Sequence, residues 1–400
     1  MKNVHYASLQ EISDLIRDQK ISPVDVVEAC LARIEKLNPK INAFITVLAD
    51  GAREQAVQAE KEIRARNWRG IPIGLKDMYD TAGIKTTAAA EYFKDRVPKK
   101  DASAVGKLKD VGAIIIGKTN MHTLAMGTTS QVSFFGPVHN PWNEEYIAGG
   151  SSGGSAAAIA SGMCYATIDT DAIGSTRLPA ACCGVVGYKC TWGLIDNSGI
   201  LDGEEADEMI LKLATVGITT RDVADTVLVT DLLASSSYAD ALQKESVSQR
   251  IGVVTNFGAN KPIRGSFDEA VAVFKKLGYD MIETTAPFNE NPDMQHIDES
   301  RKTANDDIFR DVDVLILPTT ASEVLTAKAI GDNPQALSPQ NTFFANYYAL
   351  PAISVPCGFD KNGLPVGLQI VGKQDDDSTV LQVAQAYQHA TKWHENHPAE

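Results

Sequence analysis

The sequence predicts an α/β fold in which helices and a layered sheet form one unit. Short runs rich in β-branched residues alternate along the chain with longer segments of helical periodicity. No internal repeat or low-complexity linker interrupts this alternation, and 44% of the residues are hydrophobic, which is enough to bury a large core. We therefore expect residues 1–400 to form a single domain rather than separate all-α and all-β domains.

The first elements of the chain are predicted to be helices. Ser8 and Glu11 have the spacing of a capping box, and apolar residues then recur on one helical face. Ser22, followed by proline, begins a second helix, which we expect to end near Pro39. A third helix, at 52–66, is rich in Ala and Glu and is predicted to lie on the surface.

Strands and helices then alternate to the end of the chain. The predicted strands are 113–116, 165–168, 251–254, 314–317 and 352–355. The predicted helices are 102–110, 155–161, 221–234, 267–277 and 378–391. Residues 284–312 are polar, and we expect them to form a loose excursion on the surface.

The charge of the chain excludes several classes of partner. With a net charge of −14, it lacks the excess of Lys and Arg needed to replace counterions on nucleic acid or on an anionic membrane. Neither a secretory leader nor an apolar run of about 18 residues is visible, so the expected location is the cytoplasm. We predict no nucleic-acid partner and no membrane partner.

The cysteines give no sign of a metal or cofactor site. None of the six forms a Cys-x-x-Cys pair or has a histidine at ligand spacing. Most lie in apolar contexts, which predicts reduced, buried thiols. We expect neither a metal nor another cofactor.

Two short motifs match catalytic patterns but lack the required context. Residues 112–119 fit the P-loop pattern, yet the middle of the motif is a run of three isoleucines that predicts a strand rather than a phosphate-binding loop. Residues 150–154 fit Gly-x-Ser-x-Gly with Ser152 as nucleophile, but this elbow requires a buried strand directly before it. Residues 140–146 read as a loop, so we reject both interpretations.

A third, longer pattern is more specific. Residues 149–155 read Gly-Gly-Ser-Ser-Gly-Gly-Ser, residues 174–180 read Gly-Ser-Thr-Arg-Leu-Pro-Ala, and Lys76 lies in Gly-Leu-Lys-Asp. Ser151 follows Lys76 by 75 positions and precedes Ser175 by 24. These runs and spacings resemble the amidase signature family. Further similar segments lie at 117–121, 140–142, 183–189, 317–320, 350–356 and 363–369.

The resemblance implies a fold and a catalytic triad. The fold would be a large, mixed, mostly parallel twisted sheet with helices on both faces. Ser175 would be the nucleophile, and Lys76 would be the base. Ser151, after a cis peptide bond, would relay the proton between them.

The chemistry requires Lys76 to be neutral. A neutral lysine needs its pKa lowered from about 10.4 to about 7–8, at a cost of about 4 kcal/mol that burial can impose. Ile71, Ile73 and Leu75 precede Lys76 and favour such burial. The alternative is a surface lysine paired with Asp77.

The remaining site residues are also implied by the resemblance. The oxyanion hole would use the backbone N–H groups of Ala172, Ile173, Gly174 and Ser175. Ser152, Asp171 and Arg177 would support the site, and contact with substrate is an alternative role for Arg177. The substrate pocket would include Ala125, Met126, Gly127 and Thr128.

The chain departs from the family pattern in two ways. Asp169 and Ile173 stand where the family usually has glycine, and a β-branched residue disfavours a positive φ. The chain is also short between Phe288 and Asp311 and just before Ile71, so residues 245–312 would form a shortened peripheral segment. The leaving-group side of the site would then be more open, or completed by a second copy of the chain or by a small accessory subunit.

Three functions remain open from the sequence. The first is hydrolysis of a small amide, or of a urea-like or carbamate-like compound, through a serine acyl-enzyme that releases ammonia or an amine. The second is an A-type component of a tRNA-dependent amidotransferase, which would release ammonia from glutamine for a partner. The third is a catalytically inactive scaffold, which the Ile173 departure keeps open.

Overall fold

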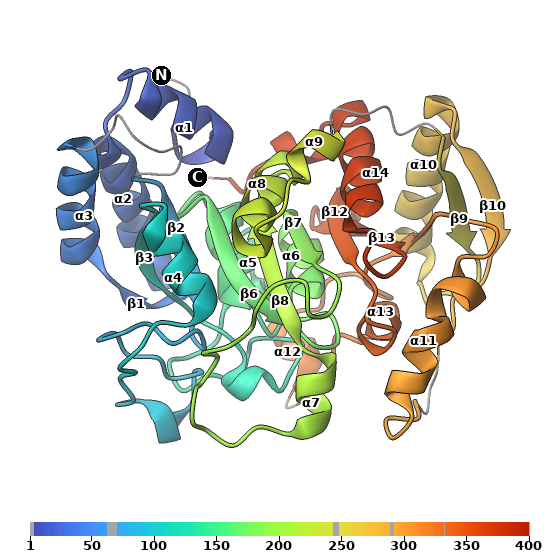
Figure 1. Cartoon of the computed structure of the whole chain (residues 1–400), viewed down its shortest axis with the longest axis horizontal. Helices are drawn as coiled ribbons and strands as arrows, with labels where there is room; N and C mark the ends of the chain where they lie inside the picture. Colours follow the sequence, from blue (N-terminus) through green and yellow to red (C-terminus); the bar gives the residue numbers. More distant parts are fainter. Residues whose placement is uncertain (1–3, 62–69, 243–247, 289–291, 332, 400) are drawn as a thin grey trace.

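The computed structural model describes residues 4–61, 70–242, 248–288, 292–331 and 333–399. In this part of the chain, eleven strands form one sheet in the order β1-β3-β2-β6-β8-β7-β12-β13-β11-β9-β10 (Figure 1). Two further strands, β4 and β5, form a small separate sheet.

The strands of the large sheet are β1 (Phe44–Val47), β2 (Pro72–Lys76), β3 (Ile114–Thr119), β6 (Ala166–Asp171), β7 (Val186–Lys189), β8 (Thr215–Thr220), β9 (Arg250–Val254), β10 (Asp280–Thr284), β11 (Val314–Pro318), β12 (Ala352–Phe359) and β13 (Pro365–Gly372). The small sheet consists of β4 (His139–Asn140) and β5 (Asn143–Ile147).

The α-helices are α1 (Leu9–Arg17), α2 (Pro23–Ile41), α3 (Ala49–Lys61), α4 (Ser103–Asp110), α5 (Gly153–Ala160), α6 (Arg177–Cys183), α7 (Glu208–Leu213), α8 (Val223–Ala234), α9 (Ala239–Leu242), α10 (Lys261–Leu277), α11 (Ile297–Ile308), α12 (Ala327–Ile330), α13 (Phe343–Tyr347) and α14 (Asp377–Ala390). The 3₁₀ turns are η1 (Val4–Tyr6), η2 (Glu91–Phe93), η3 (Thr123–Ala125) and η4 (Trp393–Glu395).

The predicted α/β fold, with a mixed sheet flanked by helices, is confirmed. The expectation that parallel pairing dominates is wrong, because only the β3–β2, β2–β6, β11–β9 and β9–β10 pairs of the described sheet are parallel. The six other neighbouring pairs are antiparallel. The difference arises in the middle of the sheet, where β12 and β13 form a hairpin and β8 runs against both of its neighbours.

Helices cover the sheet on both faces. α5 and α6 pack together on one face, whereas α8, α14 and α10 pack on one another over the opposite face (Figure 1). Glycine lets α6 approach the sheet closely. A Cβ at Gly217 of β8 would lie 2.0 Å from Oγ1 of Thr176, and one at Gly187 of β7 would lie 2.5 Å from Cβ of Ala180.

Most predicted elements occur in the structure, with shifted ends. The capping box predicted at Ser8 is present. The helix predicted to begin at Ser22 does begin there, with a further capping box formed by Ser22 and Asp25. α2 continues through Pro39 to Ile41, so the predicted end is slightly early. The predicted helix 52–66 corresponds to α3, which begins at Ala49, and its last residues lie outside the described part of the chain.

The segment 284–312 is not a loose excursion, because it contains α11. Ile297, Arg301 and Ala304 are buried at a spacing that places them on one face of this helix. Arg301 donates hydrogen bonds to the backbone oxygens of Tyr347 and Asn346. Because most residues of segment 284–312 are polar, the sequence pattern did not indicate this short buried stripe.

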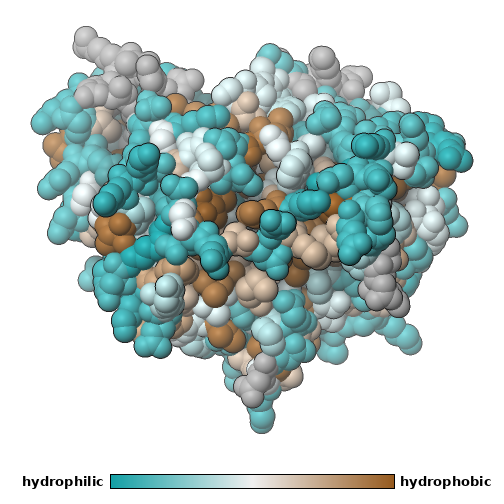
Figure 2. All heavy atoms as spheres, turned by 60° about the horizontal axis from the view of Figure 1, so that its bottom comes forward, coloured by the Kyte–Doolittle hydropathy of each residue, from teal (hydrophilic) through white to brown (hydrophobic). Residues whose placement is uncertain are grey.

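Hydrophobic area is also present on the surface. Figure 2 shows brown patches among hydrophilic ones on the face that carries α7. The exposed large apolar side chains of the described residues include Leu124, Met126 and Phe134, together with Met209 and Leu211 of α7. No helix in the described ranges combines the length and apolar character required to cross a bilayer.

Candidate active site

The site lies where two neighbouring parallel strands end. β2 pairs with β6 in the register Ile73↔Ala166 and Leu75↔Ile168. Lys76 is the last residue of β2, and the turn that contains Ser175 follows β6. Because the carboxyl ends of parallel strands meet at one edge of a sheet, this pairing brings together residues that are about one hundred positions apart.

Lys76 is completely buried and makes two short hydrogen bonds. Its Nζ lies 2.8 Å from Oγ of Ser151 and 2.9 Å from Oγ1 of Thr170. Burial lowers the pKa of Lys76 to about 8, although the charges of Asp169 and Asp171 act in the opposite direction. About a tenth of Lys76 is therefore neutral at pH 7, far more than for a lysine with the ordinary pKa. This burial excludes the alternative of a surface lysine.

Ser151 is held from several sides. The peptide bond between Gly150 and Ser151 is cis, as the resemblance implied. The backbone oxygen of Ser151 accepts hydrogen bonds from the N–H of His122 at 2.9 Å and from Oγ of Ser130 at 3.2 Å. The side chain of Ser151 is thereby left facing Lys76.

Ser175 lies in the turn between β6 and α6 and is buried, with 4% of its surface exposed. Its backbone oxygen accepts a hydrogen bond of 3.1 Å from the N–H of Ser152. This bond ties the Ser175 turn to the residue next to Ser151, so the three predicted catalytic residues belong to one site. The transfer of a proton between the two serine hydroxyls stays a prediction.

Ser152 does not occupy a nucleophile elbow. β5 ends at Ile147, so the segment expected to be a loop does contain a short strand, but this strand belongs to the small separate sheet. The hydroxyl of Ser152 is buried, with no hydrogen-bond partner among the described residues. A side chain in this position does not present a nucleophile to substrate.

The predicted oxyanion hole needs one correction. The N–H of Gly174 donates to Oδ1 of Asp171 at 2.7 Å, so it is not available to an oxyanion. The N–H groups of Ala172, Ile173 and Ser175 donate to no backbone oxygen in the described part of the chain, so they remain candidate donors to an oxyanion. The sequence alone could not show that the carboxylate of Asp171 accepts the hydrogen bond from the N–H of Gly174.

The Ile173 departure is accommodated by the backbone. Ile173 does not have a positive φ, whereas Gly174 has a φ of 127°. A Cβ at Gly174 would lie 2.3 Å from Oγ1 of Thr342. Glycine is therefore required at position 174, and position 173 can hold isoleucine. Oγ1 of Thr342 in turn donates to the backbone oxygen of Ile173 at 2.5 Å.

Asp171 and Arg177 form a completely buried ion pair that braces the turn. Nη2 and Nε of Arg177 lie 2.9 and 3.0 Å from the carboxylate oxygens of Asp171. Burial acts to raise the pKa of Asp171, but the charge and hydrogen bonds of Arg177, the charge of Lys189 and the N–H of Thr176 together outweigh it and hold that pKa well below the usual range. Arg177 also donates to the side chains of Gln369 and Asn346, both at 2.6 Å. All these contacts join parts of the protein to one another, as a supporting role requires.

The segment of the predicted pocket runs past Ser151. A Cβ at Gly150 would lie 2.8 Å from the backbone nitrogens of Thr129 and Ser130, which shows how closely this segment approaches the cis peptide. Ala125 and Met126 are partly or largely exposed, whereas Gly127 and Thr128 are buried. The contribution of these four residues to substrate binding stays a prediction.

Sequence reasoning missed His122, Ser130 and Thr170. The first two hold the backbone of Ser151, and Thr170 bonds to Lys76. Burial, followed by the charge of Lys76, lowers the pKa of His122 to about 4, so this imidazole is neutral near neutral pH. Thr170 precedes the Ser175 turn directly, and this position is the one signal that could have indicated it.

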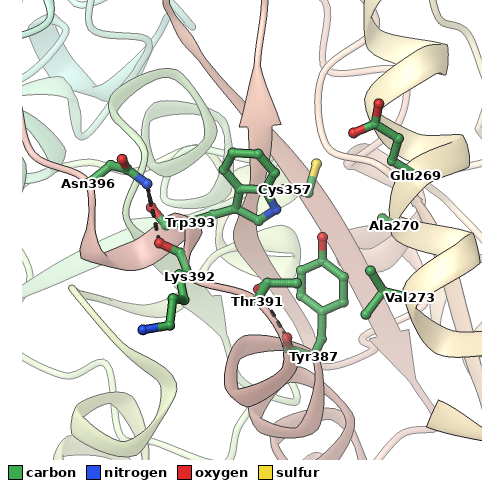
Figure 3. Close-up of a pocket in the computed structure, with 9 residues that line it drawn as sticks. All are labelled: Glu269, Ala270, Val273, Cys357, Tyr387, Thr391, Lys392, Trp393 and Asn396. Carbon is green, nitrogen blue, oxygen red and sulfur yellow. Dashed lines mark hydrogen bonds between the residues drawn. The ribbon is translucent and has the colours of Figure 1, made fainter. Parts of the chain in front are cut away.

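A separate pocket of about 370 Å³ lies between α10, β12 and the end of the chain (Figure 3). Trp393 and Tyr387 line it together with Glu269. No predicted site residue contributes to this pocket. Across the described residues, no group of three or more His, Cys, Asp or Glu side chains is arranged to hold a metal ion. The six cysteines are all buried and unpaired in disulfides, as predicted.

Comparisons with known proteins show which proteins the chain is similar to. A family model described as Amidase matches residues 25–295 and 291–381. The A-type component of the glutamyl-tRNA(Gln) amidotransferase of Roseiflexus sp. (strain RS-1) is 30% identical, over 100% of this chain and 99% of that protein. Its counterpart in Geobacter sp. (strain M21) is 31% identical, over 97% and 98%. The first alignment extends over 489 residues against a chain of 400, so the relative carries segments that this chain lacks.

Solved structures share the fold over nearly the whole chain. A 6-aminohexanoate cyclic dimer hydrolase in complex with substrate has a TM-score of 0.87 at 24% identity, covering 98% of this chain and 99% of that one. The A-type component of the glutamyl-tRNA(Gln) amidotransferase from Thermotoga maritima has a TM-score of 0.81 at 25% identity, covering 97% and 96%.

Proposed function

The chain belongs to the amidase family and is a hydrolase of carbon–nitrogen bonds, and we propose that it cleaves a small-molecule amide through an acyl-enzyme on Ser175. The observation that carries this proposal is the buried hydrogen bond between Lys76 and Ser151, beside the turn of Ser175. A lysine whose pKa is lowered to about 8 can accept a proton near neutral pH.

The first half of the reaction forms the acyl-enzyme. Neutral Lys76 takes the hydroxyl proton of Ser151 while Ser151 takes that of Ser175, and Oγ of Ser175 attacks the carbonyl carbon. The resulting oxyanion lies against the N–H groups of Ala172, Ile173 and Ser175. The C–N bond then breaks, and Lys76 returns the proton through Ser151 to the leaving ammonia or amine.

The second half releases the acid. A water molecule loses a proton along the same relay to Lys76 and attacks the acyl ester of Ser175. When the ester bond breaks, the proton returns to Oγ of Ser175. The two halves together consume one amide and one water and produce one carboxylic acid and one amine or ammonia.

The character of the predicted pocket favours a neutral organic amide. Ala125, Met126, Gly127 and Thr128 carry no charge, whereas glutamine presents both an ammonium and a carboxylate group for recognition. Exposed apolar side chains such as those of Leu124 and Met126 add hydrophobic area in the same segment. The alternative, glutamine hydrolysis as the A-type component of an amidotransferase, is supported by the names of the curated relatives at 30–31% identity.

A substrate panel separates these functions. The purified chain alone should release ammonia or amine from at least one simple aliphatic, aromatic, urea-like or carbamate-like compound, and the Ser175→Ala variant should not. Release from glutamine alone, and only in the presence of a partner, would favour the amidotransferase component. Equal rates for the wild type and Ser175→Ala over the whole panel, glutamine included, would support the inactive scaffold.

The proposed base predicts how activity depends on pH. Below its pKa of about 8, Lys76 is increasingly protonated and cannot accept a proton. We therefore expect kcat/KM to fall about tenfold per pH unit on the acid side of this value and to level off above it. Initial rates in buffers of constant ionic strength between about pH 5.5 and 10 test this. If the fall of kcat/KM on the acid side, the acid limb of the profile, instead lay near pH ~4, it would contradict a lysine base and favour a carboxylate base.

A further inference from the structure

A second buried ionisable group lies beside Lys76. In the parallel register of β2 and β6, Leu75 is opposite Ile168, so the next pair along the two strands is Lys76 and Asp169. Opposite residues of neighbouring strands point to the same face of a sheet. Asp169 is therefore a carboxyl group on the side of the sheet where Lys76 meets Ser151, at a position where the family pattern has glycine.

The carboxyl group of Asp169 is completely buried and only half satisfied. Its Oδ2 accepts hydrogen bonds from Oγ1 of Thr167 at 2.9 Å and from Oγ1 of Thr219 at 2.7 Å. Its Oδ1 is buried and has no partner within normal hydrogen-bond geometry in the described part of the chain. The hydroxyl of Ser155, which bonds to Thr119 at 2.7 Å, lies close enough to the carboxyl group of Asp169 to lower its pKa. A buried carboxyl oxygen without a well-formed hydrogen bond is costly, so a purely structural role, the joining of β6 to β8, does not fully account for the group.

The other charged groups around Lys76 are neutral or already paired. The carboxylate of Asp171 is held by Arg177, and His122 is neutral near neutral pH. The sequences of α5 and β8, which both pack on β6, contain no charged residue. Asp169 is thus an acid close to Lys76. No Lys, Arg or His side chain of the described residues, Lys76 included, forms an ion pair with it.

Three further titratable groups lie on or near the elements around Asp169. The hydroxyl of Tyr79 donates to the backbone oxygen of Asp169 at 2.5 Å, and Cys164 also lies near the carboxyl group. Burial raises the pKa of both side chains far above neutrality, so both stay protonated and uncharged. Asp225 of α8, the remaining helix on β6, instead accepts from the backbone at the start of α1. The basic group that titrates close to Asp169 is therefore Lys76.

We propose that Asp169 is a positioning residue whose carboxylate stabilises the ammonium ion that Lys76 becomes when it takes the proton of the serines. This proposal rests on the proposed amide hydrolysis. The proton reaches Lys76 as the tetrahedral intermediate forms, and a carboxylate in the same buried environment stabilises the new positive charge more strongly than water-exposed groups would. No atom of Asp169 needs to touch the substrate.

The titration of the two groups agrees with this geometry. Burial raises the pKa of Asp169 above its ordinary value, although hydrogen bonds from Ser155 and Thr219 and then the charge of Lys76 act to lower it. Burial lowers the pKa of Lys76, and the charge of Asp169 acts to raise it. The charge state of each group therefore affects the pKa of the other. Removing the carboxylate should lower the proton affinity of Lys76.

The Asp169→Asn variant tests the proposal through its pH profile. Asparagine keeps the size of the side chain and an oxygen that can accept from Thr219. We expect the acid limb of kcat/KM to move about one pH unit lower and kcat on the plateau to fall about threefold to tenfold, with KM unchanged. An acid limb that stays in place or moves to higher pH would overturn the proposal.

Thr219→Val is the matched control, because it removes a hydrogen bond to Asp169 but no charge. Its acid limb should move much less than that of Asp169→Asn. An equal shift would show that the effect comes from the packing between β6 and β8, and the proposal would be wrong. Thermal melting of each variant establishes that it is folded, and Asp169→Ser replaces Asp169→Asn if the latter does not fold.

A second measurement needs no substrate. The side-chain amine of Lys76, followed by NMR in lysine-labelled protein and assigned with Lys76→Ala, should titrate about one pH unit lower in Asp169→Asn than in the wild type. Identical midpoints would overturn the charge coupling even if the enzyme hydrolyses amides. A shifted midpoint in a protein that hydrolyses none of the panel would instead contradict the proposed function and support the coupling.

Discussion

Replacing Ser175 with alanine is expected to lower kcat for amide hydrolysis by about 10⁴-fold or more, because the variant cannot form the acyl-enzyme. Lys76→Met should cost about as much, since the two residues act in one relay and the loss of either stops it. The double variant should be no worse than either single one, because the effects of residues that act as a unit do not add. Product release under substrate saturation measures all three.

Ser161→Ala is the matched control for this experiment. Ser161 lies at the end of α5, and its hydroxyl, like that of Ser152, is buried without a hydrogen-bond partner among the described residues. Its replacement should leave kcat within about threefold of the wild type. Mass spectrometry of the enzyme mixed with an ester or amide substrate should show an acyl adduct in the wild type and in this control, but not in Ser175→Ala. A comparable adduct in Ser175→Ala would place the nucleophile elsewhere.

Arg177→Met is expected to destabilise the protein by about 3–5 kcal/mol, because it leaves the buried carboxylate of Asp171 without its cation. The side chains of Gln369 and Asn346 would lose charged donors as well. Urea unfolding at neutral pH measures the change in the free energy of unfolding.

Two further variants identify the cause of this loss. Arg53→Met removes an arginine from an exposed pair with Glu28 and should change the free energy of unfolding far less. Adding Asp171→Asn to Arg177→Met removes the unpaired charge and should restore part of the stability. No recovery in the double variant would mean that lost packing, rather than an unpaired charge, explains the effect.

Local sequence patterns were sufficient for the helix starts, and the family resemblance of three short segments supplied the main catalytic candidates. The capping box at Ser8 depends on two side chains three residues apart, and the helix start at Ser22 depends on the proline that follows it; both helices begin there in the structure. The apolar run before Lys76 predicted its burial, because a strand in a sheet that is covered on both faces buries the residues on each of its faces. Serines between glycines likewise indicated two tight turns, and the structure places both beside the end of β2.

Contacts between distant segments were needed for the rest. The apolar stripe of α11 became evident only once its position against Tyr347 was known, and strand direction depended on pairing partners far away in the sequence. Within the site, the N–H of Gly174 faces Asp171 instead of the substrate. Lys76 and Asp169 each follow the last printed pair of β2 and β6, Leu75 and Ile168, so their proximity depends on the register in which these two strands pair. The sequence gives each residue's type and its near neighbours directly. The hydrogen-bond partner of a buried polar group, in contrast, depends on how the whole sheet assembles.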